Sequence, residues 1–329
     1  MIITQTPLRI SFAGGGTDLA SYYAAREGFV VSAAIDKFAY VIVKERFDDL
    51  IYLNTMNKEI REDVSQIEHE LIREAMRMTG VTKGVEVTLL SDIPSEGAGL
   101  GSSSSFTVGL LNALYMYRGE QVTAEQLARE ACEIEIERLG KPIGKQDQYI
   151  AAYGGLRSFR FRRDEQVEVQ RLRVDNKQLR ELDSRLHLFF TGRTRKADVI
   201  LSKQKANTAD RSAELDGIKQ LAFDLVPSLE RGDFDRLGEL LHQNWELKRK
   251  LAAGISDDAI DGMYALARSH GALGGKICGA GGGGFLLVYC PLERQERLEK
   301  GLGDYRAMPF RLEPDGSKVI FNYRRDSWK

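Results

Sequence analysis

The fold of this chain can be inferred from the stretch Asp92-Ile-Pro-Ser-Glu-Gly-Ala-Gly-Leu-Gly-Ser-Ser-Ser-Ser105. Apolar residues alternate with polar ones before it, from 85 to 93, and this pattern predicts a strand. The apolar run after it, from 106 to 114, has the spacing of a buried helix. We therefore expect a strand, a loop with three glycines at alternate positions, and a helix.

A loop of this kind can wrap its backbone around an anion. Glycine permits unusual dihedral angles and a close approach, and the start of the following helix offers free N–H groups and the positive end of its dipole. The stretch predicts a phosphate site, with a flexible turn and an N-cap as the alternative. It is not a Walker loop, because no Gly-Lys-Ser/Thr follows, and its alternating glycines do not fit Gly-x-Gly-x-x-Gly.

Two more glycine stretches adjoin predicted strands. Gly14-Gly15-Gly16-Thr17-Asp18 follows a strand at 8–13 and places Asp18 at a helix start, as an N-cap or as a ligand of the substrate. Four glycines at 281–284 precede a strand at 285–289, where we expect a loop pressed against a ligand or another backbone. Residues 29–34 and 38–43 predict two strands joined by a hairpin turn.

Two polar segments are further candidates for function. Asp147, flanked by two glutamines, stands near the start of a short predicted helix, where it is either an N-cap or a functional carboxylate. The loop Thr191-Gly-Arg-Thr-Arg-Lys-Ala197 puts three cations within four residues. These cations either grip a phosphate or form a solvated basic loop.

Length and composition restrict the class of protein. A chain of 329 residues indicates two domains or two lobes that share a cleft. The net charge of −1, with both signs interspersed, argues against a nucleic-acid partner. The three cysteines are widely spaced and the four histidines lack a metal-like spacing, so free thiols in the cytoplasm are expected. We expect neither a signal peptide nor a membrane span.

The three glycine stretches, in this order, resemble the three motifs of the GHMP kinases, the superfamily of galactokinase, homoserine kinase, mevalonate kinase and phosphomevalonate kinase. The first is 7–18, the second, ATP-binding one is 94–105, and the third is 276–285. The resemblance runs from about residue 6 to about residue 289, and Gly-Leu-Gly-Ser-Ser is its most specific part.

This resemblance implies an α+β fold of two lobes with ATP and substrate between them. The N-terminal lobe, residues 1–175, would be ribosomal-protein-like and the C-terminal lobe, residues 176–329, ferredoxin-like. The implied partners are ATP and a small sugar phosphate, with no nucleic acid and no membrane, and a homodimer is left open.

The resemblance also implies roles for individual residues. Asp147 would accept the proton of the substrate hydroxyl, and Arg9 would stabilise its charge and the moving phosphoryl group. Mg²⁺ would be bound by Ser103 and Glu137, with Glu135 as the open alternative to Glu137. The ATP-binding residues would be Pro94, Gly97, Ala98, Gly99, Leu100, Gly101, Ser102, Ser103 and Ser104. The substrate-binding residues would be Gly15, Gly16, Thr17, Asp18, Arg193, Arg195, Gly281 and Gly282.

One departure from galactokinase concerns the substrate. Galactokinase has Glu-His where this chain has Gly15-Gly16, so two side chains are missing and a different, bulkier sugar is expected. The segments Ala-Gly-Gly-Gly-Thr-Asp-Leu, Gly-Lys-Gln-Asp-Gln-Tyr and Gly-Arg-Thr-Arg-Lys-Ala are most similar to the D-glycero-D-manno-heptose 7-phosphate kinases. These enzymes phosphorylate the anomeric O1 in nucleotide-activated heptose biosynthesis. Arg193 and Arg195 would then hold the distal 7-phosphate.

Three alternatives were weighed against this interpretation. A GHMP kinase for fucose, galactose or mannose would carry the same motifs. A sensor that binds ATP and sugar without turnover has no need of a base, which Asp147 would supply. A dinucleotide-dependent oxidoreductase fails on the glycine spacing and on the missing acidic residue after the next strand.

Overall fold

The computed structural model describes residues 1–93, 97–195 and 197–323. The strands are β1 (Ile2–Ala13), β2 (Gly28–Glu45), β3 (Ile51–Asn54), β4 (Lys58–Arg61), β5 (Val85–Ser91), β6 (Leu156–Phe161), β7 (Val167–Arg171), β8 (Leu186–Phe190), β9 (Gly274–Ile277), β10 (Phe285–Tyr289) and β11 (Lys318–Asn322). The α-helices are α1 (Ala20–Arg26), α2 (Glu70–Thr79), α3 (Ser102–Arg118), α4 (Ala124–Cys132), α5 (Gln146–Tyr153), α6 (Asn176–Asp183), α7 (Ala197–Ala206), α8 (Ser212–Arg231), α9 (Phe234–Lys248), α10 (Asp258–Ser269) and α11 (Gln295–Gly301). Short 3₁₀ turns η1 (Val64–Gln66) and η3 (Leu292–Arg294) and a π-helical turn η2 (Glu133–Arg138) complete the described elements.

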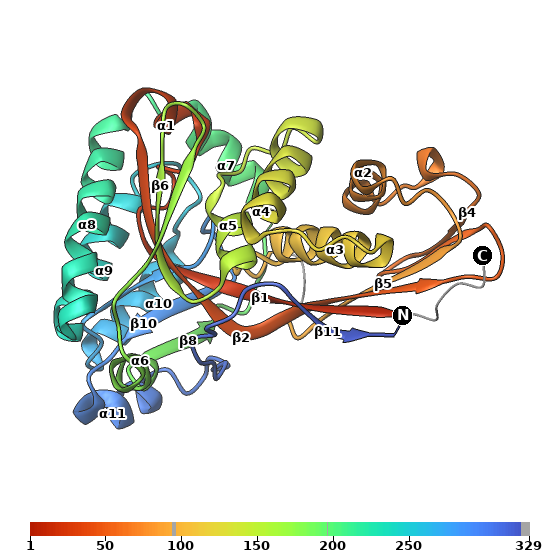
Figure 1. Cartoon of the computed structure of the whole chain (residues 1–329). Coiled ribbons are helices and arrows are strands. Elements are labelled where there is room, and N and C mark those ends of the chain that lie inside the picture. Colours follow the sequence, from red (N-terminus) through yellow and green to blue (C-terminus); the bar gives the residue numbers. More distant parts are fainter. Residues whose placement is uncertain (94–96, 196, 324–329) are drawn as a thin grey trace.

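The long strands β1 and β2 organise the first lobe. They pair antiparallel and run across the molecule, and the sheet has the order β11-β1-β2-β5-β3-β4 (Figure 1). The first half of β2 pairs with β6 and the second half with β5, so one strand serves two groups of partners. The β1–β2 register shifts after Pro7, a residue without a backbone donor for the ladder.

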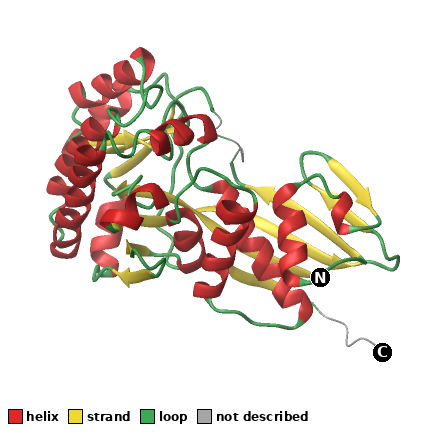
Figure 2. Cartoon of the chain, turned by 90° about the horizontal axis from the view of Figure 1, so that it is seen from above, coloured by secondary structure: helices red, strands yellow, loops and turns green. Residues whose placement is uncertain are grey.

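Helices cover one face of this sheet. Figure 1 shows α3, α4 and α5 on the same side of β1 and β2, and their apolar residues share one core with the strands. The second sheet has the order β8-β10-β9, and α8 and α9 lie side by side over it at the other end of the molecule (Figures 1 and 2). Apolar residues of β1 also pack with those of α9, so the two lobes share a core.

The expectation of an α+β chain with two lobes is confirmed. The boundary at residue 175 stays a prediction, but the chain does not remain in the second lobe after it. Strand β11 pairs antiparallel with β1, so the last described residues return to the first sheet. The segment just before β11 lies against Gly154. A Cβ atom on Gly154 would come within 2.0 Å of the carbonyl carbon of Asp315.

The predicted hairpin between residues 29 and 43 was wrong, because β2 is one continuous strand. At the expected turn, the N–H of Asp36 donates to the carbonyl of Arg311 at 2.9 Å. The Asp36 carboxylate accepts from the N–H of Arg311, also at 2.9 Å. A distant segment therefore keeps this part of the chain extended, and nothing in the local sequence announces that partner.

Gly274 marks the closest packing between the second sheet and its helices. A Cβ atom on this residue would lie 1.9 Å from the carbonyl oxygen of Gly238 in α9. Gly274→Ala is therefore expected to lower the free energy of unfolding by about 1–3 kcal/mol, as overpacked cores do. Urea denaturation measures the change.

The matched control for Gly274 is Gly262 in α10, because a Cβ atom there would meet no heavy atom within 4 Å. Gly262→Ala replaces glycine inside an exposed helix and should raise the unfolding free energy by about 0.5–1 kcal/mol. Equal effects of the two substitutions would contradict the packing assigned to Gly274.

Candidate active site

The glycine-rich loop has the backbone geometry of an anion cradle. Gly97, Gly99 and Gly101 have φ angles of +71°, +75° and +80°, in the left-handed region that other residues rarely adopt. The loop lies on the third glycine stretch, since a Cβ atom on Gly99 would come within 2.6 Å of the carbonyl oxygen of Cys278. Alanine at these positions would therefore both strain the backbone and push the two loops apart.

The first turn of α3 follows this loop directly. Ser102, Ser103 and Ser104 begin the helix, where backbone N–H groups lack intrahelical partners. The buried hydroxyl of Ser102 has no hydrogen-bond partner among the described residues. The geometry therefore fits the phosphates of ATP, which would supply the missing acceptor. Ala98 and Leu100 are buried between these residues, whereas the prediction for Pro94 lies outside the described residues.

Ser103 is joined to Glu135 rather than to Glu137. The Ser103 hydroxyl donates to Glu135 Oε1 at 2.7 Å, and Gln148 Nε2 donates to Glu135 Oε2 at 2.7 Å. Lys141 Nζ lies 3.1 Å from the same hydroxyl and 3.4 Å from Oε1. Glu135 is 0% exposed. Its carboxylate is held in place by Ser103, Gln148 and Lys141.

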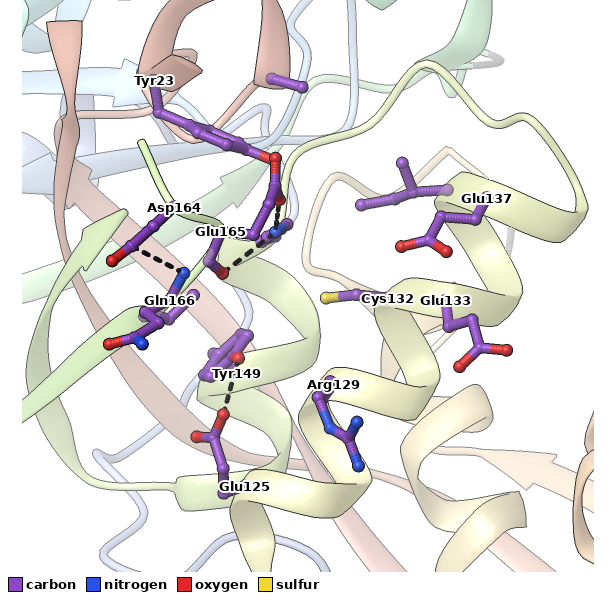
Figure 3. A pocket seen from close by; sticks show the side chains of 14 residues that line it. Tyr23, Glu125, Arg129, Cys132, Glu133, Glu137, Tyr149, Asp164, Glu165 and Gln166 are labelled. Atoms are coloured by element: carbon purple, nitrogen blue, oxygen red, sulfur yellow. Dashed lines mark hydrogen bonds and ion pairs between the residues drawn. The ribbon is translucent and has the colours of Figure 1, made fainter. Parts of the chain in front are cut away.

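The structure places Glu137, the predicted metal ligand beside Ser103, away from that serine. Its side chain is exposed and faces a separate hollow of about 760 Å³, shared with Tyr23 and Glu133 (Figure 3). The reason is the π-helical turn η2, in which the N–H of Leu139 bonds to the carbonyl of Ile134, five residues back. This extra residue in the turn changes which glutamate faces α3.

Arg9 and Asp147 form a bidentate ion pair at the centre of the site. Arg9 Nε and Nη2 donate to the two carboxylate oxygens at 2.7 and 2.5 Å, and Nη1 donates to the carbonyl of Gly99 at 2.6 Å. Burial alone would lower the pKa of Arg9, but the Asp147 carboxylate outweighs it and raises that pKa. Arg9 therefore ties Asp147 to the glycine-rich loop and remains charged.

Asp18 lies beside this pair. Its carboxylate accepts from the N–H of Gly16 at 2.9 Å and from the N–H of Gln146, at the start of α5, at 3.2 Å. Burial, followed by the charge of Asp147, raises the pKa of Asp18. Neither aspartate occupies the N-cap position of its own helix, because Leu19 and Lys145 stand there in α1 and α5. The N-cap alternative is thus excluded for both carboxylates.

A small cavity of about 80 Å³ brings these groups together. Its polar and glycine lining is Arg9, Ser11, Gly15, Gly16, Asp18, Gly144, Gln146, Asp147, Gln204, Lys248, Lys276 and Gly279. The structure thus unites five of the predicted residues, Arg9, Gly15, Gly16, Asp18 and Asp147. The sequence did not predict that Ser11, Lys248 and Lys276 line this cavity. Lys276 could have been considered, because it stands at the start of the third motif.

The other predicted substrate residues do not line this cavity. The Thr17 hydroxyl donates to the carbonyls of Gly14 and Phe29 and has a structural role. Gly281 and Gly282 pack on the segment 254–255, where Cβ atoms would come within 2.7 Å of it. The third glycine stretch is therefore pressed against other backbone at these positions.

Arg193 and Arg195 also lie outside the cavity lining. The guanidinium of Arg193 contacts the carboxylate of Asp257, and Arg195 Nη2 lies 3.9 Å from the same group. Because Asp257 caps α10, both arginines are held at the start of that helix. Their predicted grip on a distal phosphate is thus not supported by their placement, and Lys196 of the same loop lies outside the described residues.

Comparison with known proteins identifies the family. The GHMP kinases N terminal domain matches residues 65–155, and the GHMP kinases C terminal domain matches residues 225–305. A D-glycero-alpha-D-manno-heptose 7-phosphate kinase from Campylobacter jejuni is 33% identical over 315 residues, which cover 92% of this chain and 93% of the relative. The chain belongs to the GHMP kinases.

Solved structures agree with this GHMP kinase assignment. A D-glycero-D-manno-heptose 1-phosphate kinase from Bacteriodes thetaiotaomicron superposes with a TM-score of 0.83 at 28% identity, over 98% of this chain and 100% of that one. A putative sugar kinase from Campylobacter jejuni gives a TM-score of 0.78 at 31% identity, over 97% of both chains. The predicted two-lobed GHMP kinase fold and the predicted ATP-dependent kinase class are both confirmed.

The sequence predicts no membrane span. In the part of this GHMP kinase that the structure describes, every helix is too short or too polar to cross a bilayer.

Proposed function

We propose that this GHMP kinase transfers the γ-phosphoryl group of ATP to the anomeric O1 of D-glycero-D-manno-heptose 7-phosphate. The product would be the 1,7-bisphosphate, an intermediate of nucleotide-activated heptose biosynthesis in the cytoplasm. The observation that carries the proposal is the Arg9–Asp147 pair, which joins the glycine-rich loop to a polar cavity. The heptose phosphate kinase relatives support this choice of sugar.

Asp147 is the base in this proposal. Its carboxylate accepts the proton of the sugar O1 hydroxyl while O1 forms its bond to the γ-phosphorus and the bond to ADP breaks. Arg9 donates to both carboxylate oxygens, fixes their orientation and places positive charge next to the transferred group. Asp18, which lies beside this pair, would bind sugar hydroxyls.

ATP and Mg²⁺ have distinct places in this proposal. Residues 97–104 would hold the phosphates, for which the left-handed glycines and the partnerless Ser102 hydroxyl provide a fit. Ser103 and Glu135 would hold Mg²⁺, which typically takes one or two protein oxygens and completes its shell with phosphates and water. The ion would neutralise charge on the β- and γ-phosphates.

The cavity needs to widen for a sugar phosphate. About 80 Å³ is well below the several hundred Å³ of ordinary small-molecule sites. Leu201 and Gln204 of α7 form one wall, and Gln204 Nε2 lies only 2.3 Å from where a Cβ atom of Gly16 would stand. We therefore expect α7 to move outward when the sugar enters. The sugar would then occupy the space beside Gly15 and Gly16, which have no side chains.

A substrate panel tests the proposal. ADP release is measured with heptoses and hexoses, each with and without a terminal phosphate, and ³¹P NMR locates the new ester. We expect the highest kcat/KM with heptose 7-phosphate and a phosphate on O1. A preference for fucose, galactose or mannose would favour another GHMP sugar kinase, and ATP binding without ADP release would favour a sensor.

A further inference from the structure

Two buried lysines face the candidate cavity from the second lobe. Lys248 is 7% exposed at the end of α9, and Lys276 is 2% exposed within β9. Both line the cavity that contains Arg9, Asp18 and Asp147. The role of Asp147 as base assigns no function to either lysine, and buried lysines are rare unless they are paired.

Their protein partners are neutral. Lys248 Nζ donates to the carbonyls of Ile277 at 2.9 Å and Gly279 at 2.5 Å. Lys276 Nζ donates to the carbonyl of Phe12 at 3.4 Å. Across residues 1–93, 97–195 and 197–323, no carboxylate lies within ion-pair distance of either ammonium group. Because an ammonium carries three donors, both lysines have donors to spare.

The charges around the cavity leave an excess of cations. Its lining holds three cations, Arg9, Lys248 and Lys276, and two carboxylates. Arg9 and Asp147 already neutralise each other, so two ammonium groups face the single carboxylate of Asp18. A bound anion would supply the negative charge that the second ammonium group lacks, because a buried charge without a partner is costly.

Burial affects the titration of both lysines in the same direction. It lowers the pKa of Lys276 to about 8 and lowers the pKa of Lys248 well below its ordinary value. An anion placed between them would favour their charged forms again.

Ser11 adds a third donor to this region. Its hydroxyl is buried, lines the same cavity and has no hydrogen-bond partner among the residues that the structure describes. A buried polar atom without a partner is uncommon in folded proteins and points to a ligand that supplies one.

We propose that Lys248, Lys276 and Ser11 bind the phosphate monoester that the sugar already carries, so that the enzyme selects a phosphorylated substrate. This inference rests on the proposed sugar kinase function and replaces the predicted role of Arg193 and Arg195. The transferred phosphoryl group would instead lie between the glycine-rich loop and Asp147, at the edge of the cavity where Arg9 stands.

The test compares two substrates in lysine variants. The variants Lys248→Met and Lys276→Met are assayed with heptose 7-phosphate and with unphosphorylated heptose. We expect kcat/KM to fall about 10- to 100-fold for the phosphorylated sugar, the contribution of charge-assisted hydrogen bonds, and to change little for the other. Lys250→Met is the matched control, because Lys250 is exposed two residues from Lys248.

The outcomes separate this inference from the proposed function. Equal losses with both sugars would mean that the lysines act on the transferred group, and the inference would be wrong even if the wild type prefers heptose. A wild type that phosphorylates neither heptose would instead overturn the proposed function.

A second measurement uses only the wild-type protein and so does not depend on the variants folding. Calorimetric titration at about pH 8.5, in two buffers of different ionisation enthalpy, counts the protons taken up on binding. Because burial lowers the pKa of Lys276 to about 8, binding of a phosphate beside it should draw a proton onto the amine, whereas binding of the unphosphorylated sugar should not. Equal proton uptake with both sugars would contradict the inference.

Discussion

Replacing Asp147 with Asn is expected to lower kcat by about 10²- to 10⁴-fold while ATP still binds. Asparagine has nearly the same shape, but its amide cannot accept the proton of the sugar hydroxyl. It also offers one oxygen instead of two to the Arg9 guanidinium, which now makes two contacts of 2.5–2.7 Å with the carboxylate. Steady-state ADP release and equilibrium nucleotide binding measure the two effects separately.

The control for this substitution is Asp224→Asn, because Asp224 is exposed on α8 and is not among the residues that line the cavity. We expect wild-type kcat from that variant. Turnover near the wild-type rate in Asp147→Asn would mean that another group, or none, accepts the proton. A parallel loss of ATP binding would instead assign Asp147 to the nucleotide site through Arg9.

Arg9 connects the candidate nucleotide loop to the candidate base. Its guanidinium contacts the Asp147 carboxylate and the carbonyl of Gly99, and its own N–H donates to the carbonyl of Leu100 at 3.0 Å. One buried side chain therefore sets the distance between the loop that would hold ATP and the base that would activate the sugar. Lysine could not replace it, because a point charge cannot make this forked contact.

Local sequence was sufficient where backbone chemistry decides the structure. Alternate glycines predicted the loop at 97–101, and all three adopt the left-handed angles that make glycine necessary. Thr123, a residue type that favours the N-cap position, accepts from the N–H of Gln126 at the start of α4. The assembly of Arg9, Asp18 and Asp147 in one cavity could be expected only from the family resemblance.

Long-range packing explains what could not be predicted. The charged loop at 193–195 had the composition of a phosphate-binding loop. Its two arginines instead form ion pairs with Asp257, about sixty residues later in the chain. Lys248 is the last residue of α9, and its ammonium group donates to the carbonyl of Ile277 at the end of β9. Neither partner leaves a local signal in the sequence.

Replacing Glu135 with Gln is expected to lower kcat about 10²-fold and to raise the Mg²⁺ concentration needed for half-maximal rate. The substitution keeps the size of the side chain but removes the negative charge of the carboxylate that accepts from the Ser103 hydroxyl. Mg²⁺ titrations of the rate at fixed ATP measure the change.

Glu137→Gln provides the matched comparison, since both glutamates lie in the same π-helical turn and differ in the direction they face. Glu137 faces the hollow of Figure 3 and is exposed, so its substitution should leave the Mg²⁺ dependence unchanged. The opposite pattern, with the metal dependence following Glu137, would mean that the turn unwinds when nucleotide binds. Only the bound state would then select the metal ligand, and the bond between Ser103 and Glu135 would belong to the free enzyme.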